Sequence, residues 1–167
     1  ELGKKGILTG YPDGTFQPEK PVSREEFVKM IVSAAGIYNV SASSDFTDLP
    51  QSHWAYGFIA SACNDGIIAG LGNGSFGIGS NIKREDVAVI TARILDKFGK
   101  LKAPDGLNEE THFPDESQIS SYSFKSIIAL ENMGIINGFE DGSFRPQEIL
   151  TRAQAAKIIF ETRKRLS

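Results

Sequence analysis

The sequence is poor in the residues on which several classes of protein depend. Its 167 residues include one cysteine, Cys63, and two histidines, His53 and His112. A single cysteine forms no internal disulfide, and two histidines are too few for an ordinary zinc site. The sequence therefore argues against a disulfide scaffold and a zinc module, and it predicts neither a bound metal nor a cofactor.

An excess of one charge and long hydrophobic runs are also lacking. The 18 Lys and Arg residues against 21 Asp and Glu residues give a net charge of −3. Such a chain has no overall positive field for a nucleic-acid backbone, although a local patch can still bind an anion. No hydrophobic stretch approaches the roughly 20 residues that span a bilayer. We expect a globular protein that binds no nucleic acid and has no membrane span.

What the sequence does contain is one segment in three copies. Residues 6–16 recur at 66–76 and 134–144, at offsets of 60 and 68 residues and without a gap. Each copy opens with Gly-Ile and closes with Asp or Asn, Gly, one further residue and Phe. Self-similarity of this kind indicates an architecture of equivalent stacked units.

The repeats extend beyond this segment in both directions. Downstream, the same offsets place an arginine at one position in every copy, as Arg24, Arg84 and Arg152. Upstream, Phe-x-Asp at 46–48 corresponds to Phe-x-Asp at 113–115, and a first helix follows each. We divide the chain into four parts: repeat one at 1–38, without its first helix, repeat two at 45–99, a linker at 100–111 and repeat three at 112–167.

Each full repeat reads as helix, loop, helix, because hydrophobic residues follow steps of three and four on both sides of the loop. Ser23 with Glu26, and Thr151 with Gln154, predict capping boxes at the start of the second helix. Lys83 stands at the equivalent position of repeat two and cannot accept such a bond, so that helix start should be weaker or shifted. Because a helix pair with one apolar stripe is not stable alone, we expect a mainly α fold, with the three units packed around a pseudo-threefold axis or as a short solenoid.

These features together resemble S-layer homology repeats. The resemblance rests on Phe-x-Asp, on the aromatic-led first helix with Trp54 or Tyr122, on the Gly-Ile-Ile-x-Gly loop, and on the Thr-Arg-Ala-Glu-like helix start. It implies a secreted module of the bacterial cell wall or S-layer that binds secondary cell wall polysaccharide in grooves between repeats. The implied ligand is often a pyruvylated N-acetylmannosamine, and other S-layer subunits are possible partners through the rest of the host protein.

The arginines also point to an anion independently of the resemblance. A cation in the first turn of a helix is disfavoured by the helix dipole, whereas free backbone amides and a guanidinium suit a carboxylate. Trp54 and Tyr122 would supply a face for a sugar, and Thr9 and Asn137 polar groups beside the loop. The predicted ligand-binding set is Arg24, Arg84, Arg152, Lys83, Asp48, Asp115, Trp54, Tyr122, Thr9, Asn137 and Gln154.

Other interpretations of the same residues stay open. The three arginines could instead form ion pairs with Asp48 or Asp115 of a neighbouring repeat, and these two aspartates could cap the following helix or loop. At the level of function, the alternatives are a protein-interaction module and a glycan-active enzyme. We expect no enzyme, because the acidic positions recur with the repeat and do not form a unique pair of carboxylates.

Repeat one has only residues 1–5 before its loop, where repeats two and three have a first helix. We expect the vacancy to expose the hydrophobic side of the following helix, at Phe27, Met30 and Ile31. A segment upstream of Glu1, in a longer protein of which this chain is a fragment, or a partner helix would then cover that face.

Overall fold

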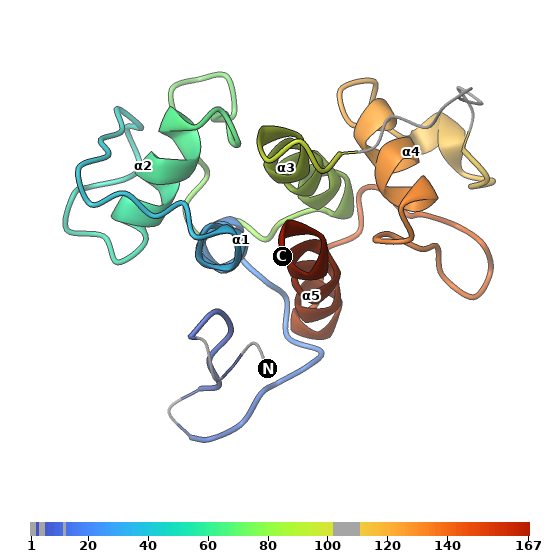
Figure 1. The fold of residues 1–167 in the computed structure, drawn as a ribbon, viewed down its shortest axis with the longest axis horizontal. Helices are drawn as coiled ribbons and strands as arrows, with labels where there is room; N and C mark the ends of the chain where they lie inside the picture. The colour runs from blue at the N-terminus through green and yellow to red at the C-terminus, as the bar shows by residue number, and fades with distance from the viewer. Residues whose placement is uncertain (1–2, 4–5, 12, 102–110) are drawn as a thin grey trace.

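The computed structural model describes residues 3, 6–11, 13–101 and 111–167 (Figure 1). In these residues the fold is mainly helical, and the β-bridges are isolated and outside any strand. The elements are α1 (Arg24–Ala35), α2 (Tyr56–Asn64), α3 (Arg84–Lys97), the short 3-10 helix η1 (Glu116–Gln118), α4 (Phe124–Asn132) and α5 (Arg152–Leu166). The predicted linker at 100–111 lies mostly outside the described residues.

The second helices of the three repeats, α1, α3 and α5, pack on one another at the centre of the molecule (Figure 1). The first helices lie outside them, α2 against α1 and α4 against α3. The first helix of each repeat therefore packs on the second helix of the repeat before it. The central helices contribute several of the largest fully buried side chains of the core, among them Phe27, Ile31, Ile94 and Leu95.

A closed ring of backbone hydrogen bonds joins the segments that lead into the central helices. The N–H of Val22 donates to the carbonyl of Leu150, that of Leu150 to Ile82, and that of Ile82 back to Val22, at 2.9–3.0 Å. These residues are equivalent under the repeat offsets. Three equivalent bonds close on themselves only around a threefold axis, so the pseudo-threefold arrangement is confirmed and the open solenoid is excluded.

The helix starts follow the capping prediction. Ser23 and Thr151 each cap their helix in a capping box, with Glu26 and Gln154 as the reciprocal acceptors. Lys83 makes no side-chain cap. The expected shift of that helix start is nevertheless wrong, because α3 begins at Arg84, in register with α1 and α5. The N–H groups of Arg84 and Glu85 donate to carbonyls of repeat three, at Glu148 and Pro146, and these bonds hold the helix start in place.

The expected exposure of Phe27, Met30 and Ile31 is wrong. All three side chains are buried, because α1 is covered by α2, α3 and α5. The helix on which no first helix packs, within the described part of the chain, is α5. Phe160 of α5 is 36% exposed. The equivalent Val32 of α1 and Ala92 of α3 are both buried.

The turn segments of repeats two and three are anchored by their aromatic residues. The ring of Phe76 packs on Phe46 with centroids 5.8 Å apart, and that of Phe144 packs on Phe113 at 5.2 Å. Phe76 and Phe144 are buried, whereas Phe16 is exposed. Among the described residues, Phe16 makes no contact of this kind with another aromatic ring, so the structure shows less support for the loop of repeat one than for the other two loops.

Candidate functional site

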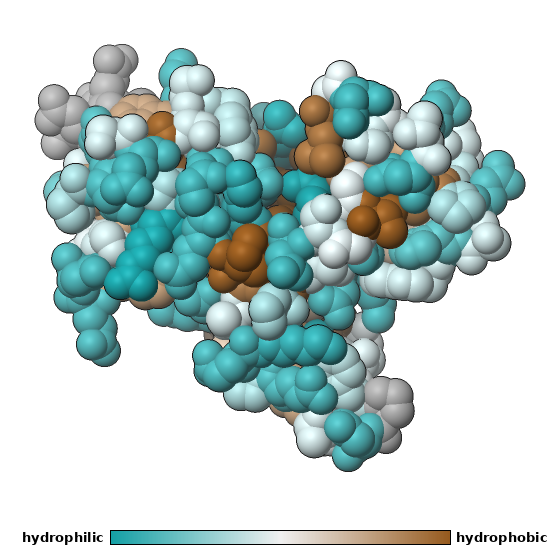
Figure 2. Space-filling model, turned by 180° about the vertical axis from the view of Figure 1, so that it is seen from behind, coloured by the Kyte–Doolittle hydropathy of each residue, from teal (hydrophilic) through white to brown (hydrophobic). Residues whose placement is uncertain are grey.

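Three grooves follow the pseudo-threefold symmetry, each between two or three repeats. A groove is formed by the loop of one repeat, the start of the same repeat's second helix and an arginine from a neighbouring repeat. Groove 1 lies at the loop of repeat one, groove 2 at that of repeat two and groove 3 at that of repeat three. Their volumes are about 200, 450 and 160 Å³. On the face shown in Figure 2, hydrophobic side chains form separate small patches among polar ones.

The three arginines reach into these grooves from the preceding repeat and are buried. Arg24 donates from Nε to the carbonyl of Phe76 at 3.2 Å, Arg84 to that of Phe144 at 2.8 Å, and Arg152 to that of Phe16 at 3.0 Å. Each contact joins one repeat to the loop of the next. The arginines therefore hold the ring of repeats together, whatever else they bind.

Aromatic rings lie against the guanidinium groups. Arg152 lies over Tyr11 and Phe16, and Arg84 over Phe139 and Phe144, with distances to the ring centroids of 4.7–5.2 Å. Arg24 lies over Phe76 alone, because Leu71 replaces the second ring in repeat two. Cation–π contacts of this kind stabilise a guanidinium that is partly removed from water. Burial nonetheless lowers the pKa of Arg84, and the charges of Glu148 and Asp115 only partly oppose that effect.

Several of the backbone amides at the helix starts are already hydrogen-bonded within the protein, which leaves fewer of them for the expected anion site. The N–H groups of Arg24, Arg84 and Arg152 donate to carbonyls of neighbouring repeats, and the capping boxes use those of Glu26 and Gln154. The guanidinium groups are thus the main groups that can receive an anion.

Asp48 and Asp115 bind the loop of their own repeat and form no ion pair with the arginines. Asp48 accepts N–H bonds from Phe76, Gly77 and Ile78 at 2.7–2.9 Å, and Asp115 accepts two, from Phe144 and Arg145. Burial raises the pKa of Asp48, but the three N–H donors together outweigh burial and hold that pKa below its usual value. Among the three groove arginines, the one ion pair within the described residues joins Arg24 Nη1 to Asp86, at 2.9 Å.

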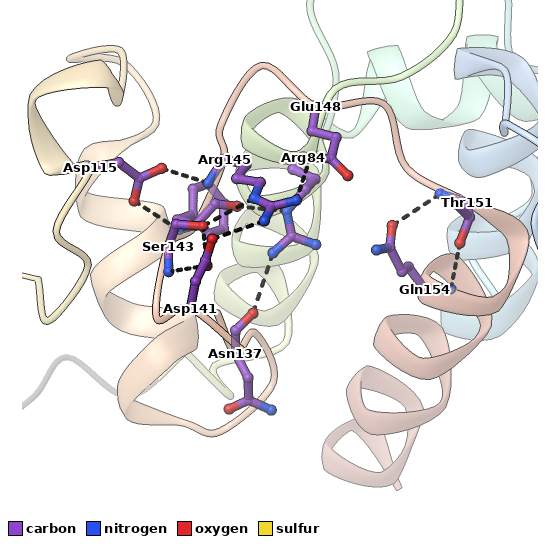
Figure 3. A network of polar contacts seen from close by, with 10 residues as sticks. Arg84, Asp115, Asn137, Asp141, Ser143, Arg145, Glu148, Thr151 and Gln154 are labelled. Atoms are coloured by element: carbon purple, nitrogen blue, oxygen red, sulfur yellow. Dashed lines mark hydrogen bonds and ion pairs between the residues drawn. The ribbon is translucent and has the colours of Figure 1, made fainter. Parts of the chain in front are cut away.

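Figure 3 shows the surroundings of Arg84 in groove 3. Arg84 Nη2 donates to the backbone carbonyl of Asn137 at 3.3 Å. Arg152 Nη2 donates to the equivalent carbonyl of Thr9 at 2.9 Å. Both residues thus contribute backbone oxygens to the arginines, while their side chains are exposed. Gln154 lines groove 3, and its side-chain oxygen caps Thr151.

The two predicted aromatic platforms lie in grooves 1 and 2. Trp54 lines groove 1 and is 54% exposed, and Tyr122 lines groove 2 and is 57% exposed. Among the described residues, no equivalent ring lines groove 3. Lys83 lies in none of these grooves, and its Nζ donates to Gln147 of repeat three at 2.6 Å.

Sequence reasoning missed a second cation in each groove. Lys29 lines groove 1, Arg93 groove 2 and Lys157 groove 3. Lys29 and Lys157 occupy equivalent positions, three residues after Glu26 and Gln154. The signal was available, because a residue three positions along a helix faces the same way.

In the part of the chain that the structure describes, no group of three or more His, Cys, Asp or Glu side chains is placed to hold a metal ion. No helix there is long and hydrophobic enough to cross a membrane.

The fold and grooves define a class of protein: a threefold ring of helix-loop-helix repeats with cationic grooves between them. The S-layer homology domain family matches residues 2–28, 45–88 and 112–156. The chain belongs to this family. The predicted location, secreted to the cell wall or S-layer, is confirmed at the level of the family and its relatives.

The relatives include anchoring and S-layer proteins. The chain is 31% identical over 95% of its length to a cellulosome-anchoring protein of Acetivibrio thermocellus, and 31% identical over 98% to an S-layer protein of Bacillus thuringiensis subsp. finitimus. It is 30% identical over 95% to an endoglucanase of Bacillus sp. strain KSM-635. The chain spans 36, 19 and 16% of the length of these three proteins, so it matches only one part of each longer chain.

Proposed function

We propose that this module anchors its host protein to the cell wall by binding an anionic secondary cell wall polysaccharide. A pyruvate ketal, as on a pyruvylated N-acetylmannosamine, presents the fixed carboxylate that the grooves are suited to receive. The module itself carries no reaction, and any activity of a host protein belongs to other domains.

One observation carries the proposal. Arg84 and Arg152 are buried in grooves, yet neither forms an ion pair with another described residue. Their Nε and Nη2 groups bind carbonyls, and Nη1 has no protein acceptor within the described ranges. A largely buried cation without a direct ion-pair partner is costly, so a ligand carboxylate at Nη1 would be favoured.

Groove 1 has further groups suited to a saccharide. Trp54 offers an exposed ring face, and Lys29 adds positive charge near Arg152. The hydroxyl of Tyr11 is buried and has no hydrogen-bond partner within the described part of the chain. The ring of Tyr11 lies against the guanidinium of Arg152 and so helps to position it in groove 1.

The test is sedimentation of the protein with purified cell walls, before and after removal of the pyruvate. Charge-assisted bonds contribute about 1.5–3 kcal/mol, so Arg152→Ala should weaken binding about 10- to 150-fold in groove 1. Arg152→Lys should restore binding only in part, because lysine lacks the planar fork of donors. The matched control is Lys164→Ala, which removes a cation from the exposed end of the same helix.

Because Arg152 also joins two repeats, each variant is first checked for an intact fold by circular dichroism. Folded Arg84→Ala and Arg152→Ala variants that bind walls as the wild type does would exclude these grooves. Binding that survives removal of the pyruvate and of the polysaccharide would favour a protein partner instead.

A further inference from the structure

Groove 2 differs from the other two grooves in having a carboxylate that contacts the arginine of the groove. Asp86 Oδ2 accepts from Arg24 Nη1 at 2.9 Å, and the two side chains are only 25% and 10% exposed. The same Nη1 position is without a protein acceptor in Arg84 and Arg152, among the residues that the structure describes. The protein itself thus places a carboxylate where the other grooves leave the guanidinium open.

The reason lies in the helix cap of repeat two. The residues equivalent to Asp86 are Glu26 and Gln154, whose side-chain oxygens accept the backbone N–H of Ser23 and Thr151 at 2.9 and 3.1 Å. Asp86 is one methylene shorter and takes no part in a capping box. Its carboxylate is therefore available to the groove.

The second oxygen of Asp86 is also engaged. Asp86 Oδ1 accepts from the hydroxyl of Tyr122 at 2.8 Å. Arg24 comes from repeat one, Asp86 from repeat two and Tyr122 from repeat three, so the three side chains form a polar bridge across groove 2. Burial and the negative charge of Asp86 raise the pKa of Tyr122, which keeps its hydroxyl protonated as a donor.

We infer that Asp86 is an internal carboxylate that excludes the ligand carboxylate from groove 2, so that only grooves 1 and 3 bind the charged end of the polysaccharide. The inference rests on the proposed function and adds to it the residue that selects among the grooves. A ligand carboxylate at Arg24 would have to displace Asp86 or lie beside a like charge. The internal carboxylate is tethered to the groove and competes at a high effective concentration.

The net charge of the groove does not explain the exclusion. Arg93 also lines groove 2 and leaves it positive. Groove 2 is in addition the largest of the three, at about 450 Å³, so lack of space is not the reason either. The occupied Nη1 of Arg24 is what distinguishes it.

The test is a titration with the methyl glycoside of pyruvylated N-acetylmannosamine, followed by calorimetry and by the Nε–Hε signals of the three arginines in NMR spectra. We expect two sites in the wild type, with shifts at Arg84 and Arg152 and none at Arg24. Asp86→Gln copies the residue of repeat three, and should add a third site and a shift at Arg24. Asp96→Gln, which removes an exposed charge from the same helix, should stay at two sites.

Two results would overturn the inference while leaving the proposed function intact. One is a saturating shift of Arg24 in the wild type, which needs no variant and so does not depend on how well Asp86→Gln folds. The other is a folded Asp86→Gln protein that still has two sites and an unmoved Arg24 signal. If no arginine shifts and calorimetry shows no binding, the proposed function fails, and the inference fails with it.

Discussion

The carboxylate of Asp48 offers a sharp test of how the loops are held. Its Oδ1 accepts from the N–H of Phe76, and its Oδ2 from those of Gly77 and Ile78. Asp48→Asn keeps an oxygen for Phe76 but turns an amide NH2 toward two N–H donors. A donor that loses its partner costs about 1–3 kcal/mol, so this substitution should lower the free energy of unfolding by about 2–4 kcal/mol.

Asp115→Asn is the matched variant in repeat three. There Oδ2 accepts from a single N–H, that of Arg145, which is exposed. We therefore expect a smaller loss, about 1–2 kcal/mol. Urea unfolding at pH 7, followed by circular dichroism, gives both values.

The effect of Asp48 should also depend on pH. Its pKa is lowered in the folded protein from the ordinary value of 3.8, so its stabilising contribution is complete above that value. The contribution is lost as the pH falls through the lower folded pKa. The difference between wild type and Asp48→Asn should therefore be constant from pH 5 to pH 7 and should narrow in stronger acid. A loss below about 0.5 kcal/mol, which is typical of an uninvolved surface residue, would refute this account of the loop.

Two further variants test the groove and the helix start. Lys157→Met should weaken ligand binding in groove 3 several-fold and make that binding less dependent on salt, while the free energy of unfolding stays near that of the wild type. Calorimetry at two salt concentrations measures the binding, and an unchanged affinity would show that Lys157 is not part of the site. Thr151→Ala should destabilise the protein by about 1 kcal/mol through loss of the helix cap, whereas Lys83→Thr should stabilise it by about 0.5–1 kcal/mol by creating one. Thermal unfolding gives the sign of both changes, and a loss on Lys83→Thr would show that the Lys83–Gln147 contact matters more than the cap.

The sequence predicts local features of this fold well and contacts between repeats less well. The capping boxes at Ser23 and Thr151 and the uncapped start at Lys83 follow from adjacent residues, and the structure has them. The partner of Arg24 does not follow in this way. Asp48 and Asp86 both belong to the repeat after that of Arg24, and only the ring of repeats brings Asp86 to the guanidinium.

The position of the vacancy beside the ring shows the same limit. The repeat alignment predicts that repeat one lacks a first helix among its residues. It does not indicate that a first helix packs on the preceding repeat, and so it places the uncovered face on α1 instead of α5. Phe160, and not Phe27, is the side chain that this arrangement leaves exposed.

The central claim is that the grooves recognise a carboxylate on a sugar. Its most direct test is a calorimetric titration of this chain with two saccharides that differ only in the pyruvate ketal. We predict saturable binding of the pyruvylated saccharide at two sites, and binding of the unmodified saccharide at least about 10-fold weaker, since the charge-assisted bonds are lost. Equal affinity for the two saccharides would contradict the account.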